Sequence, residues 1–222
     1  MRSIGVPVLE YAVLSRREVQ ADLAETIAFA EQVAAYPLFV KPANLGSSVG
    51  ISKARNREEL AKALQLAARF DRRILVERGI NPREIEISVL GNTEAQCTVP
   101  GEIVPGDEFY TYKDKYQSGD PEVAIPAPLP EAQTALLQQY AIDAFKAVDG
   151  AGLARVDFLI DKVSGEVYFN EINTMPGFTE ISMYPKLWLY SGLSYTELVN
   201  RLIELALERK AEQDETIRKF EE

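Results

Sequence analysis

The chain has 222 residues, of which 46% are hydrophobic and 26% are charged, which is the composition of a folded globular protein with a substantial core. It contains no histidine and one cysteine, Cys97, which excludes histidine-based catalysis, histidine-ligated metals, disulfide frameworks and cysteine-rich zinc sites. The net charge of −10 argues against binding to nucleic acid, and the lack of an apolar run long enough for a membrane span or a signal peptide predicts a cytoplasmic protein without a membrane partner.

The first 79 residues predict a β-α-β-β-α-β arrangement, with strands expected over 7–14, 36–40, 49–53 and 74–76. Ser15 with Glu18 fits a capping box and predicts one helix that continues through Ala34. Asn56 with Glu59 fits a second capping box and predicts another helix, with an apolar face formed by Leu60, Leu64 and Ala67.

Residues 79–83 (GINPR) interrupt this pattern, so we expect two α+β lobes that span 1–79 and 80–222. Gly91-Asn92 is a hairpin signal, and the segment 105–128 is predicted to be a long functional loop. The strands expected in this lobe are 84–90, 94–99, 101–104, 154–160 and 166–172. One helix is expected over 131–148, with Leu137, Tyr140 or Ala141, Ala144 and Val148 facing inward. A last helix is capped by Ser194 and Glu197, with a stripe formed by Leu198, Val199, Leu202, Ile203 and Ala206.

A loop of small residues, Gly46–Gly50, joins two of the predicted strands, and Lys41 precedes it. Glycine backbone amides, serine hydroxyls and a nearby lysine suit a phosphate group. The spacing matches neither a Walker A loop nor a dinucleotide-binding fingerprint. On the residues alone, a phosphate site and an ordinary flexible hairpin are equally good interpretations.

A second group of polar residues is more specific. Arg155 and Asp157 are two apart on one predicted strand, and Glu171 and Asn173 are two apart on the next. If the two strands pair, one guanidinium, two carboxylates and one amide converge, and such oxygen donors suit Mg²⁺ bound together with phosphates. The alternative is a surface cluster of salt bridges. The otherwise apolar strands favour the metal, because a buried carboxylate needs a partner or a cation.

Three further features are weaker. The turn 174–179 (TMPGFT) places the Gly177 amide near the predicted metal, where it could donate to an oxyanion, although an ordinary Pro-Gly turn is an equal interpretation. The segment 109–116 (FYTYKDKY) suits a lid over phosphates, and its nucleic-acid interpretation conflicts with the net charge. Glu77 and Glu84 flank the break at 79–83, where a nucleoside could bind, but they are unremarkable by themselves.

Six blocks in this order resemble the ATP-grasp ligases, and within them the D-alanine–D-alanine ligase family. They are FVKPANLGSSVGISK (39–53), ILVERGI (74–80), REIEISVLG (83–91), FYTYKDKY (109–116), GLARVDFLI (152–160) and NEINTMPGFTEISMYPKLW (170–188). The resemblance covers nearly the whole chain, and the last block is highly specific. It implies an ATP-grasp fold of the α+β class, in which two lobes clasp ATP.

The resemblance also implies roles for single residues. Lys41 would bind an ATP phosphate beneath the loop that contains Gly46, Ser47, Ser48 and Val49. The rest of the nucleotide would be contacted by Glu77, Arg78, Ile80, Glu84, Phe109, Lys115 and Asn170. Two Mg²⁺ ions, or Mn²⁺ in their place, would be held by Asp157, Glu171 and Asn173.

The remaining implied roles concern the amino acid substrates. Arg155 and the Gly177 amide would stabilise a tetrahedral intermediate, and Ser182 and Met183 would contact the second D-alanine. Tyr116 would favour an amine over a hydroxy acid as the second substrate. The family reaction proceeds through an acylphosphate of the first D-alanine and serves peptidoglycan precursor synthesis in bacteria.

The resemblance departs from the family pattern at the front, because family members carry an N-terminal α/β domain that this sequence lacks. We therefore expect the ATP-grasp portion alone. Three alternatives stay open: a nucleotide-binding module without ligase turnover, a ligase of the same fold with a different carboxylate and amine, and a homodimer formed through a surface that the missing domain would leave exposed.

Overall fold

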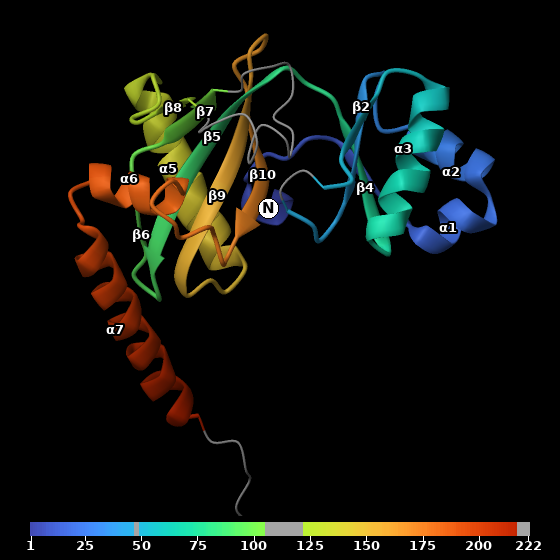
Figure 1. Ribbon diagram of the computed structural model, residues 1–222. Helices are drawn as coiled ribbons and strands as arrows, with labels where there is room; N and C mark the ends of the chain where they lie inside the picture. Colours follow the sequence, from blue (N-terminus) through green and yellow to red (C-terminus); the bar gives the residue numbers. More distant parts are fainter. Residues whose placement is uncertain (47–48, 105–121, 217–222) are drawn as a thin grey trace, which may run out of the picture. The chain divides into compact units, whose positions relative to one another are not determined.

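The computed structural model describes residues 1–46, 49–104 and 122–216 (Figure 1). The chain folds as two compact units. The smaller unit is formed by Leu9–Pro82, and the larger unit by Met1–Val8, Arg83–Val104 and the described residues from Glu122 onward. The predicted lobe boundary at residue 79 stays a prediction; residues 1–8 pack within the larger unit.

The smaller unit is a four-stranded antiparallel sheet with helices on one face (Figure 1). Its strands, in spatial order, are β1 (Tyr11–Ser15), β4 (Arg73–Arg78), β2 (Leu38–Pro42) and β3 (Ser52–Ala54). The helices are α1 (Arg16–Ala21), α2 (Leu23–Ala30) and α3 (Arg57–Phe70). Alternate strand residues pack against these helices in one core, which includes Leu14, Leu38, Val40, Leu60, Leu64, Ile74 and Val76. The predicted strand–helix order is confirmed, with one difference in the first helix.

The first helix is divided at Asp22, so the prediction of one helix from Ser15 to Ala34 is wrong. Ser15 does form the predicted capping box with Glu18. Asp22, however, adopts an extended conformation and its carboxylate accepts a hydrogen bond from the Glu25 amide, so it begins a second helix. The second predicted box is half formed. The Asn56 side chain accepts from the Glu59 amide, but the Glu59 carboxylate accepts from the Arg55 amide.

The larger unit contains a sheet in the order β10-β9-β5-β7-β8, with β6 paired to β5. The strands are β5 (Pro82–Gly91), β6 (Gln96–Cys97), β7 (Gly101–Val104), β8 (Glu122–Ala124), β9 (Gly152–Asp161) and β10 (Val167–Asn173). The first residues join this unit: the Phe169 amide donates to the Pro7 carbonyl at 2.8 Å, and Val8 forms a parallel bridge with Phe169. A short 3₁₀ turn, η1 (Arg2–Ile4), precedes this contact.

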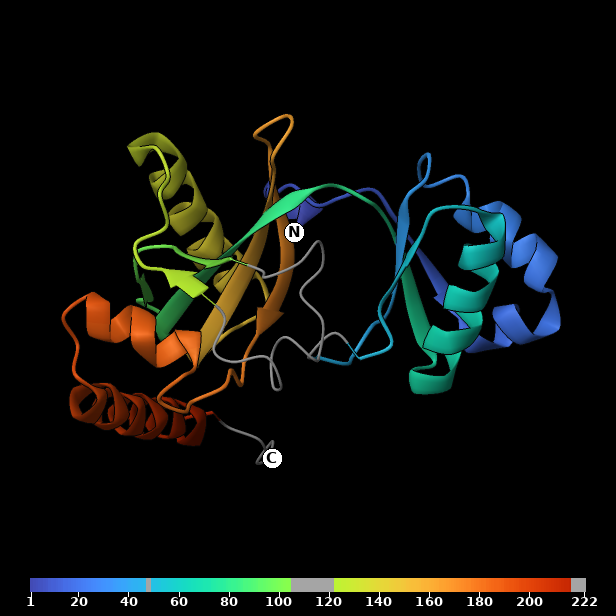
Figure 2. The same ribbon diagram turned by 45° about the horizontal axis from the view of Figure 1, so that its top comes forward.

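Helices lie on both faces of the larger sheet (Figure 2). Helix α5 (Glu131–Ala147) packs Leu137, Ala141 and Phe145 against one face, with Ile87 and Val156 among its partners. On the other face, α6 (Met183–Tyr190) and α7 (Tyr195–Asp214) form a separate cluster with Leu90. The second face is therefore apolar where α6 and α7 pack.

Several expectations for the larger unit need correction. Residues 122–124 form β8 inside the segment predicted as a loop, and α6 was not predicted at all. Val148 is exposed because it lies at the C-cap of α5. In α7, Leu198 and Leu205 are the buried residues, whereas Ile203 and Ala206 face solvent. No helix in the described ranges has the length and apolar character needed to cross a membrane.

Candidate functional site

The predicted polar residues of β9 and β10 lie side by side. The two strands are antiparallel, with Asp157 opposite Glu171 and Arg155 opposite Asn173. Cross-strand partners point to the same face of a sheet. Alternation places this group on the face opposite α5, because Val156 and Phe158 point into the α5 core. The hairpin prediction is therefore confirmed, including the convergence of the four side chains on one face.

A register shift in β10 explains why both carboxylates reach this face. Val167 and Phe169 point toward the α5 core, so simple alternation would turn Glu171 toward the core as well. The ladder instead shifts between Phe169 and Glu171, and Asn170 is the extra residue. Beyond the shift, Ile172 is opposite Val156 on the core face and Glu171 is opposite Asp157 on the polar face.

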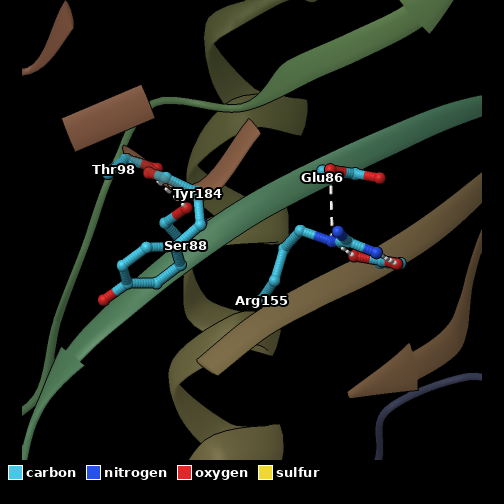
Figure 3. A network of polar contacts seen from close by, with 6 residues as sticks. Glu86, Ser88, Thr98, Arg155 and Tyr184 are labelled. Carbon is cyan, nitrogen blue, oxygen red and sulfur yellow. Dashed lines mark hydrogen bonds and ion pairs between the residues drawn. The ribbon is translucent and has the colours of Figure 1, made fainter. Parts of the chain in front are cut away.

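Arg155 is the centre of a buried ionic network (Figure 3). Its Nε and one terminal nitrogen donate to the two oxygens of Asp157, each at 2.7 Å. Its Nε also lies 3.1 Å from Oε2 of Glu86, which comes from the neighbouring strand β5. Glu86 is 6% exposed and Asp157 is 9% exposed, so both carboxylates are nearly enclosed.

The network stabilises the positively charged form of Arg155. Burial by itself would favour the neutral form of a guanidinium. The attraction of Asp157, supported by its hydrogen bonds and by Glu86 and Glu171, outweighs this effect and raises the pKa of Arg155. Three carboxylates around one guanidinium leave an excess of negative charge on this face. Such an excess favours a further cation.

The donor set fits a hard divalent cation in part. Asp157, Glu171 and Asn173 offer only oxygen ligands, which suits Mg²⁺. Across the residues described here, no three Asp, Glu, His or Cys side chains are grouped so that they could hold a metal by themselves. Two carboxylates and an amide would therefore need oxygen ligands from a phosphate or from water, which is how Mg²⁺ is commonly bound.

The turn that follows β10 brings Gly177 and Ser182 together. The Ser182 hydroxyl accepts a hydrogen bond from the Thr179 amide at 3.0 Å. A Cβ at position 177 would lie 2.9 Å from the Ser182 Oγ, so a larger residue there would displace the Ser182 hydroxyl from its hydrogen bond with Thr179. The Asn173 side chain accepts from the Met175 amide at 3.1 Å, which ties the same turn to the end of β10.

Helix α6 is fixed to β5 by a buried polar network (Figure 3). The Ser88 hydroxyl donates to the Tyr184 carbonyl at 3.2 Å, and the Tyr184 hydroxyl donates to the Val89 carbonyl at 3.0 Å. Burial raises the pKa of Tyr184, so its hydroxyl stays a donor. These bonds set the start of α6, where Ser182 is the N-cap and Met183 is 6% exposed.

In the smaller unit, Lys41 and Glu77 form an ion pair with Nζ and Oε2 2.8 Å apart. Both lie on the sheet face opposite the helices, because Val40 and Val76 point into the helical core. Arg78 pairs with Glu10 on the neighbouring segment, at 2.6 Å. The pairing of Lys41 with Glu77 was not foreseen from the sequence.

The loop after Lys41 is described only in part. Gly46 and Val49 are joined by a backbone hydrogen bond of 3.3 Å, while Ser47 and Ser48 lie outside the described residues. The same applies to Phe109, Lys115 and Tyr116, so their predicted roles stay predictions. Ile80 is half-buried between β4 and β5, and Glu84 lies on β5. Alternation puts Glu84 on the same sheet face as Glu86.

Glu86 is the functional candidate that sequence reasoning missed. Within the predicted strand 84–90 it is an ordinary polar position, for which solvent exposure is the usual expectation. The structure buries it beside Arg155. One signal was available: Glu86 lies two residues after Glu84, in a strand that ends in the apolar run Val89-Leu90. No local pattern, however, identifies Arg155 as the partner of Glu86.

A cavity of about 360 Å³ lies elsewhere in the larger unit, near the start of α7. It contains none of the predicted site residues. Its walls include Leu90, Gly91, Glu94, Trp188, Leu193 and Arg201. The ionic network on β5, β9 and β10 is therefore the better candidate for chemistry.

Comparisons with known proteins identify one family. The family described as "D-ala D-ala ligase C-terminus" matches residues 1–204. A D-alanine–D-alanine ligase of Heliobacterium modesticaldum is 56% identical over 207 residues, which are 93% of this chain and 57% of that relative. This chain therefore spans little more than half the length of that relative.

Solved structures show the same similarity. The D-alanine–D-alanine ligase from Coxiella burnetii matches with a TM-score of 0.79 at 40% identity, covering 96% of this chain and 56% of that one. The VanG D-Ala:D-Ser ligase from Enterococcus faecalis matches with a TM-score of 0.80 at 34% identity, covering 92% and 58%.

Proposed function

This chain belongs to the D-ala D-ala ligase C-terminus family and has the α+β ATP-grasp fold, and from that premise we propose that it serves the ATP-dependent ligation of two D-alanines. One observation carries the proposal. Arg155, Asp157 and Glu171 gather on one face of the larger sheet, with an excess of negative charge around a buried guanidinium. Such a site can hold a divalent cation together with phosphate oxygens.

The family resemblance assigns nucleotide-binding roles to residues of each unit. In the smaller unit, Lys41 would bind an ATP phosphate, in exchange for or in addition to its pairing with Glu77. Glu77, Arg78, Ile80 and Glu84 would contact the nucleoside. In the larger unit, Asn170 would bind ATP, and Asp157, Glu171 and Asn173 would hold Mg²⁺, which when bound would neutralise phosphate charge.

The proposed chemistry has two steps. A carboxylate oxygen of the first D-alanine attacks the terminal phosphorus of ATP, the bond from that phosphorus to its bridging oxygen breaks, and ADP leaves. The amine of the second D-alanine then attacks the carbonyl carbon of the acylphosphate, phosphate leaves, and the amine proton passes to phosphate or solvent. No protein nucleophile is needed, which suits a chain without histidine.

The protein would contribute positioning and electrostatic stabilisation. Arg155 would donate to the oxygen that becomes negatively charged when the amine attacks, and the Gly177 amide would donate to the same oxygen. Ser182 and Met183, at the start of α6, would contact the second D-alanine. The hydrogen bonds of Ser88 and Tyr184 would keep this helix start in place.

A second candidate is a nucleotide-binding module that does not turn over by itself. The chain covers 57% of the Heliobacterium modesticaldum ligase, so similarity to that relative does not by itself transfer turnover to this chain. A different amine is a further possibility within the same chemistry, because the relative from Enterococcus faecalis is named a D-Ala:D-Ser ligase.

Two measurements separate these candidates. Calorimetric titration with a non-hydrolysable ATP analogue, with and without Mg²⁺, tests nucleotide binding; we expect Mg²⁺-dependent binding that Asp157→Asn weakens. Asp161→Asn is the matched control, because Asp161 lies on the same strand and the same face. Phosphate release and D-alanyl-D-alanine formation, with D-serine as a competitor, then test turnover.

The outcomes are distinct. Dipeptide formation in proportion to the protein establishes the ligase. Binding of the analogue without phosphate release on addition of D-alanine establishes the module. A folded chain that binds no nucleotide refutes both proposals.

A further inference from the structure

Glu86 has a place in the network that the roles proposed so far do not use. It extends from β5, whereas Arg155 and Asp157 are both on β9. Among the charged residues that the structure describes, only Glu86, at 6% exposure, and Asp157, at 9%, are buried, and the Glu86 Oε2 lies 3.1 Å from the Arg155 Nε. In Figure 3 the Glu86 and Arg155 side chains point toward one another across the two strands.

Arg155 and the proposed cation make competing demands on Asp157. Both Asp157 oxygens accept short hydrogen bonds from Arg155, at 2.7 Å each. A cation that binds Asp157 must share these oxygens with the guanidinium or displace it. Because a buried guanidinium without a partner is costly, its displacement requires a second anion within reach.

We infer that Glu86 is a positioning residue for the proposed ligase site: it holds the Arg155 guanidinium from β5, and so lets Asp157 turn its carboxylate to a divalent cation. The inference rests on the proposed function. Glu86 meets the requirements because it is charged, buried and already in contact with the Arg155 Nε. Glu171 is a weaker alternative, because it is exposed and would be a ligand of the cation itself.

The arrangement also serves the proposed role of Arg155 in catalysis. A guanidinium has five N–H donors and can bind one carboxylate while donating to another oxygen. Held by Glu86, Arg155 keeps its place on the sheet face and retains terminal N–H groups for the reacting carbonyl oxygen. Without Glu86, Arg155 would stay on Asp157 and compete with the cation.

The test is a double-mutant cycle with Mn²⁺ alone as the probe, measured by the loss of the free-ion electron paramagnetic resonance signal. The four proteins are the unaltered chain, Glu86→Gln, Arg155→Met and the double variant. We expect Glu86→Gln to weaken Mn²⁺ binding about 10- to 100-fold, the usual effect of removing a residue that orients a metal ligand. In the Arg155→Met background the same change should have no effect, because nothing then competes for Asp157.

The cycle distinguishes positioning from simple charge attraction. If Glu86 acts only through its negative charge, its removal weakens Mn²⁺ binding equally in both backgrounds, and the inference is wrong. Arg155→Lys provides a second background should Arg155→Met not fold; lysine cannot bind Asp157 through two parallel hydrogen bonds, so the effect of Glu86→Gln should shrink there as well.

Glu102→Gln is the matched control. Glu102 is a partly buried carboxylate of the same sheet, on β7, and it accepts two hydrogen bonds from Arg83, at 2.8 and 2.7 Å. Its removal should lower the melting temperature as Glu86→Gln does, but leave Mn²⁺ affinity unchanged. An equal loss of Mn²⁺ affinity in Glu102→Gln would show a general structural effect and overturn the inference.

The outcomes also separate this inference from the proposed function. Mn²⁺ binding that Asp157→Asn weakens and Glu86→Gln does not would refute the role of Glu86 and leave the metal site intact. A folded, unaltered chain that binds no Mn²⁺ would refute the metal site, and the role of Glu86 with it.

Discussion

At the scale of single residues, the sequence does not predict contacts between side chains on strands that are far apart in the chain. Arg155, Asp157, Glu171 and Asn173 could be grouped from their spacing, because they belong to one hairpin. Glu86 could not, because its contact with Arg155 joins segments that are far apart in the chain. The pairing of Lys41 with Glu77 was missed for the same reason.

Cys97 offers a residue-scale prediction about pH. Burial raises the pKa of its thiol from the usual 9.0 to about 11, because the interior disfavours the thiolate. The rate of its reaction with a disulfide reagent should therefore be low at neutral pH and increase until about pH 11. A rate that levels off near pH 9 in folded protein would contradict the predicted shift.

The same shift has a consequence for stability. The folded state binds the thiol proton more tightly than the unfolded state does. The protonated thiol therefore makes its full contribution to the free energy of unfolding below pH 9, and this contribution is lost as the pH rises toward 11. Controls for the thiol reaction are simple, because Cys97 is the only cysteine. Urea-unfolded protein gives the reaction rate of the exposed thiol, and Cys97→Ser gives the background rate of the reagent. Circular dichroism on the same samples verifies that the chain is folded at each pH.

At the scale of elements, helix starts with a local signal were predictable and helices that depend on context were not. The capping boxes at Ser15 and Ser194 form as their spacing indicates. Helix α6 has no side-chain capping bond at its N-cap Ser182, and it contains Pro185 in its first turn, where proline is tolerated. The shift at Asn170 had a signal in the apolar spacing Val167, Phe169, Ile172, which changes from two to three.

Asp22 provides an element-scale prediction. Its carboxylate caps α2 by accepting from the Glu25 amide at 2.9 Å, at the point where the expected single helix divides. Asp22→Ala should lower the free energy of unfolding of the smaller unit by about 1 kcal/mol, the usual cost of losing an N-cap. Urea titration followed by circular dichroism measures the change. Asp22→Asn is the control, because asparagine also caps helices and should leave stability nearly unchanged.

At the scale of the whole molecule, the chain builds separate cores for its two units. The core of the smaller unit includes Leu64, and that of the larger unit includes Leu137; both side chains are fully buried. Neither cluster contains a residue of the other. Cores of this kind can lose stability independently.

Leucine truncation tests this independence. Leu64→Ala should destabilise the smaller unit by about 2 to 5 kcal/mol, the range for a leucine deleted from a core. Differential scanning calorimetry should then show one transition moved to lower temperature and the other unchanged. Leu137→Ala should move the other transition. A single transition that shifts in both variants would show that the two units unfold together.

The contact of the first residues with β10 has a consequence for how the protein is made. Pro7 and Val8 bind Phe169, so the larger unit begins before the smaller one and is completed after it. Residues 1–8 are synthesised well before β10, so their backbone contacts with Phe169 cannot form until that strand has left the ribosome. The two segments that meet at this bridge are therefore separated in time by the synthesis of the whole segment 9–82.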